Sequence, residues 1–149
     1  MYAYVDQPVE RLCMGGRFLL WAMRGWSQAV ESGRCPPIAL SAGFSAVGGL
    51  AAMRDFHMAM TLFNHDALGQ ISVAPMECPN IIEDEAIVLG MWRDVALGDF
   101  ANMRATLALT VARESISPLA QAMTTVLARL VASGFDMTGL TREILKEEK

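Results

Sequence analysis

The stretch from Ile71 to Glu85 constrains the fold most, because it separates two helical halves of the chain. It reads I-S-V-A-P-M-E-C-P-N-I-I-E-D-E, and apolar and polar residues alternate at its start as they do in a β-strand. Pro75 removes a backbone donor, which excludes a central strand, and Pro79 disfavours a helical conformation at Cys78. The sequence therefore predicts a short extended segment that crosses between helices and then starts one.

Three acidic residues follow this crossing. Asn80 can cap the helix that begins there, and the helix dipole favours negative charge in a first turn. Consecutive residues of a helix point in different directions, so we do not expect Glu83, Asp84 and Glu85 to converge on a substrate. The pattern is typical of a charged first turn.

Apolar residues recur at steps of three and four on both sides of the crossing, and glycines or prolines separate the runs. These patterns predict five main helices, over residues 8–33, 37–64, 82–97, 100–113 and 117–133. In the first helix, Arg17, Arg24 and Glu31 are expected on the polar side. In the last, the inner face is expected to consist of Leu119, Met123, Val126, Leu127 and Leu130.

The second predicted helix carries no charge between Pro36 and Met53. Each glycine inside a helix costs about 1 kcal/mol relative to alanine, so Gly48 and Gly49 indicate that another helix comes close, or that the helix is broken there. A membrane span is the rival interpretation, because the uncharged run reaches the lower length limit. Few of its residues are large and apolar, and its flanks lack aromatic or basic anchors, so we expect a buried helix and no membrane association.

The length of 149 residues suits one domain with a substantial core. The fold class is therefore all-α: a compact bundle of about five helices with one short extended crossing, in a single domain over 1–149. The ends, 1–7 and 138–149, are expected to be loosely ordered.

Composition narrows the function classes. Hydrophobic residues make up 53% of the chain and charged residues only 19%, which indicates either a very full core or an apolar surface that meets a partner. The twelve basic residues are scattered and the net charge is −4, so no nucleic-acid partner is expected. Three cysteines without a spacing pattern and a start without a secretory signal favour a cytoplasmic protein.

No arrangement of residues points to catalysis, to a metal or to a cofactor. Neither C-x-x-C nor H-x-x-x-H occurs, and the acids after Cys78 disfavour a thiolate, so this cysteine is interpreted as structural. His57 lies on a polar stripe and is expected to be solvated. The candidates for ligand contact are Trp92, Met60, His57 and Cys78.

Two motifs resemble a family of short alphaproteobacterial proteins known only as a domain of unknown function. They are A-P-x-x-C-P, here from Ala74 to Pro79, and R-x-L-L-x-A-x-R, here from Arg17 to Arg24. The resemblance extends from Arg17 to Leu130 and implies a bacterial, all-helical protein without an implied activity. Three cysteines precede the proline in that family, whereas this chain has Met76 and Glu77 in the first two places, so the resemblance carries no thiol or metal chemistry.

The helix over 82–97 is apolar nearly all round, so it must be covered on all sides. A second chain can provide that cover, which predicts a homodimer with Trp92 or the region from Met53 to Phe63 in its interface. The function expected is therefore that of a non-enzymatic protein that acts through protein–protein contact. The alternative is a small-molecule binder, with an apolar pocket between helices lined by methionines and tryptophans, and an enzyme ranks third.

Overall fold

Six α-helices and three short 3-10 helices form the part of the chain that the structure describes. The structure is a computed structural model, and it describes residues 4–140. The α-helices are α1 (Met14–Glu31), α2 (Pro36–Ala46), α3 (Met53–Asp66), α4 (Glu83–Leu97), α5 (Phe100–Thr110) and α6 (Ile116–Ala132). The 3-10 helices are η1 (Val9–Arg11), η2 (Leu50–Ala52) and η3 (Arg113–Ser115). Residues 4–140 contain no β-strand, so the predicted all-α bundle is confirmed, with six α-helices rather than five.

The sixth helix arises because the predicted helix over 37–64 is broken at its glycine pair. Gly48 has a φ of +71°, a left-handed conformation that suits glycine and ends α2, and η2 then leads into α3. A Cβ on Gly49 would lie 2.6 Å from Leu130 Cδ2, so α6 packs closely there. At Gly48 the nearest atom, Ser133 O, would be 3.8 Å away. The predicted break of the helix near Gly48 and Gly49 is therefore confirmed, and the end of α6 contacts both glycines, through the Leu130 side chain at Gly49 and at ordinary contact distance at Gly48.

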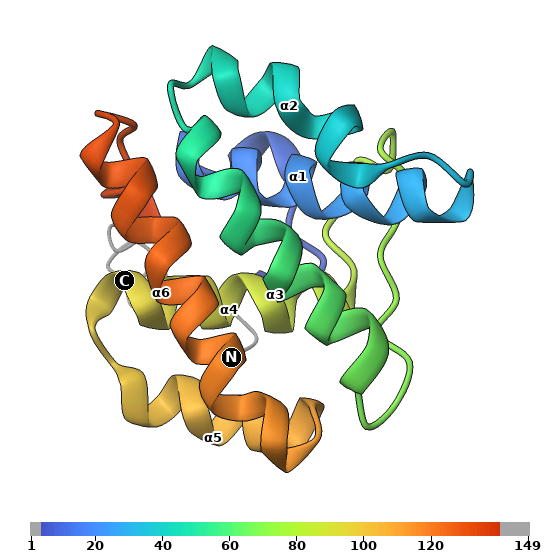
Figure 1. The fold of residues 1–149 in the computed structure, drawn as a ribbon, viewed down its shortest axis with the longest axis vertical. Helices are drawn as coiled ribbons and strands as arrows, with labels where there is room; N and C mark the ends of the chain where they lie inside the picture. The colour runs from blue at the N-terminus through green and yellow to red at the C-terminus, as the bar shows by residue number, and fades with distance from the viewer. Residues whose placement is uncertain (1–3, 141–149) are drawn as a thin grey trace.

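The helices form a bundle with α2 near one end and α5 at the other (Figure 1). α1 packs against α2, α3 and α4, and α3 crosses α6. α5 packs against α4 and α6. The first helix begins at Met14 and not at Pro8, because Pro8 instead precedes the single turn of η1.

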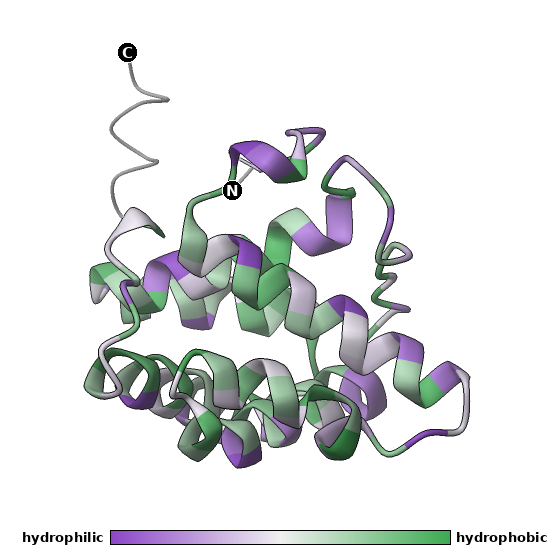
Figure 2. Cartoon of the chain, turned by 90° about the horizontal axis from the view of Figure 1, so that it is seen from above, coloured by the Kyte–Doolittle hydropathy of each residue, from purple (hydrophilic) through white to green (hydrophobic). Residues whose placement is uncertain are grey.

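The other helices of the same chain bury most of the apolar side chains of α4. Trp92 and Leu89 are both 0% exposed. The predicted inner face of α6 is also confirmed, since all five of its residues are buried. Green, hydrophobic residues occur along every helix, and the purple, hydrophilic ones are scattered between them (Figure 2). A second chain is therefore not required to bury Trp92 and Leu89 of α4.

The N-terminal residues in the described range are held against the crossing segment (residues 71–82). Tyr4 is 2% exposed, Asp6 N donates to Ile81 O at 3.0 Å, and Ile81 N donates to Gln7 O at 2.9 Å. These contacts involve part of the expected loose N-terminal end, and in the C-terminal one Leu140 is buried. The rest of the two expected loose ends, 1–3 and 141–149, lies outside the described residues. No helix within the described range is long and apolar enough to cross a membrane.

Candidate functional site

Arg24 fixes the crossing segment to the helices. The prediction that Arg24 lies on the polar side of its helix is wrong, because the residue is only 3% exposed. Its Nε lies 2.8 Å from Glu85 Oε2, and its Nη2 lies 2.9 Å from Glu85 Oε1. The guanidinium also donates to the carbonyls of Cys78 at 2.7 Å, Asn80 at 2.9 Å and Met76 at 3.4 Å. We call this cluster the Arg24–Glu85 clamp.

Glu85 completes the clamp from the start of α4. Its two oxygens accept hydrogen bonds from Ala74 N at 3.0 Å and from Ile82 N at 3.1 Å. Ile82, and not Asn80, is the N-terminal cap of α4. The hydrogen bond that Arg24 donates to Glu85 raises the pKa of Arg24, so the guanidinium stays charged although it is buried.

The three acidic residues in the first turn of α4 point in different directions and have different contacts. Asp84 Oδ2 accepts from Ser72 N at 2.7 Å, whereas Glu83 is exposed. Glu85 is 1% exposed, so it is a buried structural group rather than part of a solvated first turn. The two buried charges of the clamp are paired with each other, and the clamp's remaining hydrogen bonds go to backbone groups of residues 74–82. The clamp is therefore structural.

The four residues selected from the sequence do not share a pocket. Trp92 is fully buried, and its Nε1 has no hydrogen-bond partner among the described residues. Met60 is 6% exposed and lines a cavity of only about 20 Å³. A cavity of that size holds about one water molecule. Both residues are buried, and this cavity at Met60 is too small for a drug-sized ligand.

His57 is half-buried and bonded rather than simply solvated. Its Nδ1 accepts a hydrogen bond from Trp26 Nε1 at 2.9 Å. An imidazole that accepts at Nδ1 carries its proton on Nε2, so the bond requires the neutral ring. This pair ties α1 to α3.

Cys78 is also half-buried, and its Sγ donates to Asn80 O at 3.3 Å. Its own carbonyl accepts from Arg24. Among residues 4–140, no three His, Cys, Asp or Glu side chains lie close enough together to hold a metal ion. The local geometry thus gives Cys78 a part in the clamp.

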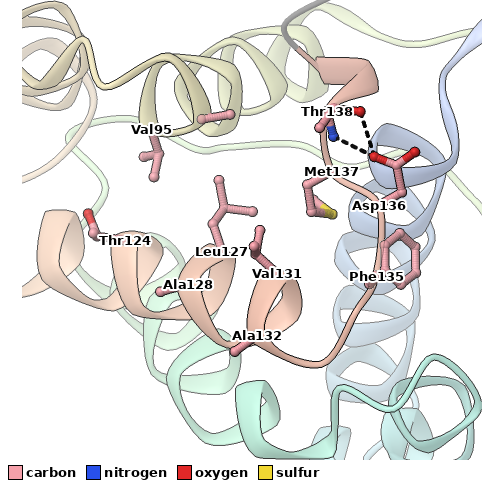
Figure 3. Close-up of a pocket in the computed structure, with 11 residues that line it drawn as sticks. Val95, Thr124, Leu127, Ala128, Val131, Ala132, Phe135, Asp136, Met137 and Thr138 are labelled. Carbon is pink, nitrogen blue, oxygen red and sulfur yellow. Dashed lines mark hydrogen bonds between the residues drawn. The ribbon is translucent and has the colours of Figure 1, made fainter.

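A groove lies between α4 and α6 in the described part of the chain. Its volume is about 720 Å³, within the range of roughly 300–1,000 Å³ that is typical of small-molecule sites. Val95 and Leu127 extend toward each other from the two helices, and the segment from Phe135 to Thr138 closes one end (Figure 3). The full lining is Val95, Ala96, Thr124, Leu127, Ala128, Val131, Ala132, Phe135, Asp136, Met137 and Thr138. We call this feature the α4–α6 groove.

The lining is almost entirely apolar. Its only charged side chain is Asp136, whose Oδ1 accepts from Thr138 N at 3.0 Å and from Thr138 Oγ1. Val131 is 58% exposed at the groove, and Leu97, next to the lining residue Ala96, is 48% exposed. Large apolar side chains left open beside an apolar hollow are typical of a surface that takes up a partner or ligand.

A buried carboxylate fixes the α4–α5 turn near the groove. Asp94 Oδ2 accepts from Asn102 Nδ2 at 2.8 Å, and Asp94 is 6% exposed. Burial raises the pKa of Asp94, an effect that the Asn102 hydrogen bond partly offsets. The side chain next along α4, Val95, lines the groove.

None of the four candidate residues lines the α4–α6 groove. A sequence signal for it does exist: α6 carries no charged residue from Ile116 to Ala128, although several of these residues are exposed. The sequence analysis expected methionines and tryptophans to line a pocket between helices, whereas the α4–α6 groove is lined by one methionine, Met137, and no tryptophan. Comparisons with protein-family models, curated proteins and solved structures gave no match to this chain.

Proposed function

We propose that the protein is a non-enzymatic binding protein, which takes an apolar small molecule into the α4–α6 groove. The observation that supports the proposal is the groove itself: about 720 Å³, walled by aliphatic side chains and bordered by exposed Val131. Transfer of apolar surface from water into such a site contributes about 25 cal/mol per Å² buried.

The sequence analysis ranked a homodimer that acts through protein–protein contact first and a small-molecule binder second. We now rank the small-molecule binder first. The homodimer was inferred mainly from the need to cover α4, and a single chain buries Trp92 completely. The alternative interface from Met53 to Phe63 faces the core through Phe56 and Met60, although Met58 is 44% exposed. The argument for the dimer therefore loses its main support, while the α4–α6 groove supports the proposal of a pocket between helices.

A fluorescence titration with N-phenyl-1-naphthylamine, a neutral apolar dye, tests the proposal. We expect saturable binding at one site per chain. Ala128 is an exposed groove residue, so Ala128→Trp should fill the groove and lower the affinity at least tenfold without disturbing the core. Ala105 on α5 is exposed but does not line the groove, so Ala105→Trp is the matched control. Equal affinity in both variants would contradict the proposal.

Self-association is the second candidate, and the outer face of α2 favours it. Ile38 is 76% exposed and Leu50 is 53% exposed. The exposed residues between them are small and uncharged: Ala39, Ala42, Ser45, Ala46 and Gly48. A two-fold pair of chains is the commonest arrangement in which such a face is covered.

Light scattering during size-exclusion chromatography tests this candidate. A dimer across the micromolar range that Ala42→Glu converts to a monomer would support it. A monomer at every concentration in that range would exclude an interface through α2.

A further inference from the structure

A second hollow of mixed polarity lies next to the α4–α6 groove along α6. This hollow has a volume of about 480 Å³ and lies between α5 and α6, and Thr124 lines both spaces. Residues three and four apart lie on one side of a helix, so Ser117, Thr124 and Ala128 share the same side of α6. The two hollows therefore follow one face of α6 in succession.

The two ends of this path differ in chemistry. At the end near Val131 and Phe135 the walls are aliphatic or aromatic. At the other end, Phe100 and Met103 form an apolar part of the wall, and polar groups form the rest: the guanidinium of Arg104 and the hydroxyl and amide groups of Ser117, Gln121 and Thr125. An occupant that fits both ends has an apolar tail and a polar head.

The charge of that head follows from Arg104. Its Nη1 donates to Ser117 Oγ at 3.3 Å, and it forms no ion pair with a carboxylate among residues 4–140. No acidic side chain lines this hollow. A guanidinium presents a planar set of donors that matches a carboxylate or phosphate, so the hollow favours an anionic head.

The length of the path fits a chain-like tail. Between Ser117 and Ala132 the helix rises about 22 Å, at about 1.5 Å per residue. Small side chains at Ala120, Thr124 and Ala128 leave room along this face. A compact ligand would occupy only one of the two hollows.

We infer that the ligand is a single-chain amphiphile with an anionic head, such as a free fatty acid, with its tail in the α4–α6 groove and its head at Arg104. This inference rests on the proposed function, because it assigns the ligand of the same groove. Arg104 is a specificity-determining residue in this arrangement. The tail provides most of the affinity, and the guanidinium selects the anionic head.

Displacement of N-phenyl-1-naphthylamine by decanoate and by 1-decanol, which share a chain but differ in charge, tests the inference. Arg104→Gln should weaken decanoate about tenfold, a loss of about 1.4 kcal/mol, and leave decanol within twofold. Arg34→Gln makes the same change in net charge at an exposed position outside both hollows and should alter neither affinity. Ala128→Trp should weaken both ligands.

The outcomes separate the inference from the function on which it rests. Decanoate could bind Arg104→Gln as tightly as the parent protein, while Ala128→Trp still weakens binding of the dye. The assignment of an anionic head at Arg104 would then be wrong, and the proposed binding function would stand. If Ala128→Trp binds the dye normally, the binding function itself is wrong. Sedimentation with phosphatidylglycerol vesicles that depends on Arg104, without decanoate binding, would indicate a membrane surface instead of a free chain and would also overturn the inference.

Discussion

The Arg24–Glu85 clamp and the α4–α6 groove lie at opposite extremes of polarity. In the clamp, an arginine and a glutamate are nearly inaccessible, and together they bond to five backbone groups. In the groove, apolar side chains remain open on the outside of α4 and α6. The charged groups of the clamp are buried, whereas apolar groups of the groove are exposed. This difference supports two separate roles: the clamp maintains the fold, and under the proposed function the groove binds an external apolar group. Substitutions in one should therefore not reproduce the effects of substitutions in the other.

The largest effect is expected at the clamp. Arg24→Met leaves the Glu85 carboxylate buried without its cation and three carbonyls without their donor, so the free energy of unfolding should fall by about 3–5 kcal/mol. Urea denaturation measures it. Arg17→Met is the control on the same helix, since Arg17 is exposed and its guanidinium bonds only to carbonyls of η1. A loss below 1 kcal/mol in Arg24→Met would show that the clamp contributes little.

A smaller loss of stability is expected at the glycine pair Gly48 and Gly49, which lies against the end of α6. Leucine at position 49 would clash with Leu130, so Gly49→Leu should cost about 1–3 kcal/mol by overpacking. Gly48→Ala should cost about 1–2 kcal/mol for a different reason, the left-handed backbone at φ +71°. Thermal and urea melts compare the two variants. If the affinity for the dye decreased together with the stability in these two variants, the proposal that the groove and the core have separate roles would be contradicted.

The next prediction concerns Asp94, which is buried beside the groove. The pKa of Asp94 is higher in the folded state than in the unfolded state, so the folded state binds the proton more tightly. The contribution of Asp94 to the free energy of unfolding therefore falls as the pH rises from its unfolded pKa to its folded pKa. Asp94→Asn removes this titration and can keep an acceptor for Asn102. Relative to the parent protein, the variant should therefore gain stability between pH 3 and pH 7, by less than about 1 kcal/mol. A gain toward low pH would contradict the direction of the shift.

The smallest change in stability is expected for Ala128→Trp. The side chain lies at the surface of α6, so the free energy of unfolding should change by no more than about 0.5 kcal/mol although ligand binding is lost. Urea denaturation of the same samples that enter the dye titration checks this. A loss as large as that of Arg24→Met would mean that the groove is part of the core and not a free surface.

The sequence predicted those parts of the fold that local patterns encode. Periodic apolar residues identified the inner face of α6, and the turn signals placed most helix ends within a few residues. The clamp was missed because Arg24 and Glu85 are 61 positions apart, and α1 packs against neighbours on more than one side. A periodicity analysis assigns only one buried face to each helix.

The groove was missed for a related reason. Its walls come from the last turns of α4 and α6 and from the segment after α6, which meet only in the folded chain. The aromatic and methionine residues selected as ligand contacts, Trp92 and Met60, are large apolar groups, and these are among the residues that a core buries first. The uncharged outer face of α6 was the more informative signal.

The most direct test of the account is a titration of methyl-labelled methionines observed by NMR. Met137 lines the α4–α6 groove, whereas Met60 lies in the core with no space for a ligand. On addition of N-phenyl-1-naphthylamine, the account predicts a saturable shift of the Met137 methyl signal, an unchanged Met60 signal, and no Met137 shift in Ala128→Trp. A Met137 signal that stays in place while the dye binds elsewhere on the chain would contradict it.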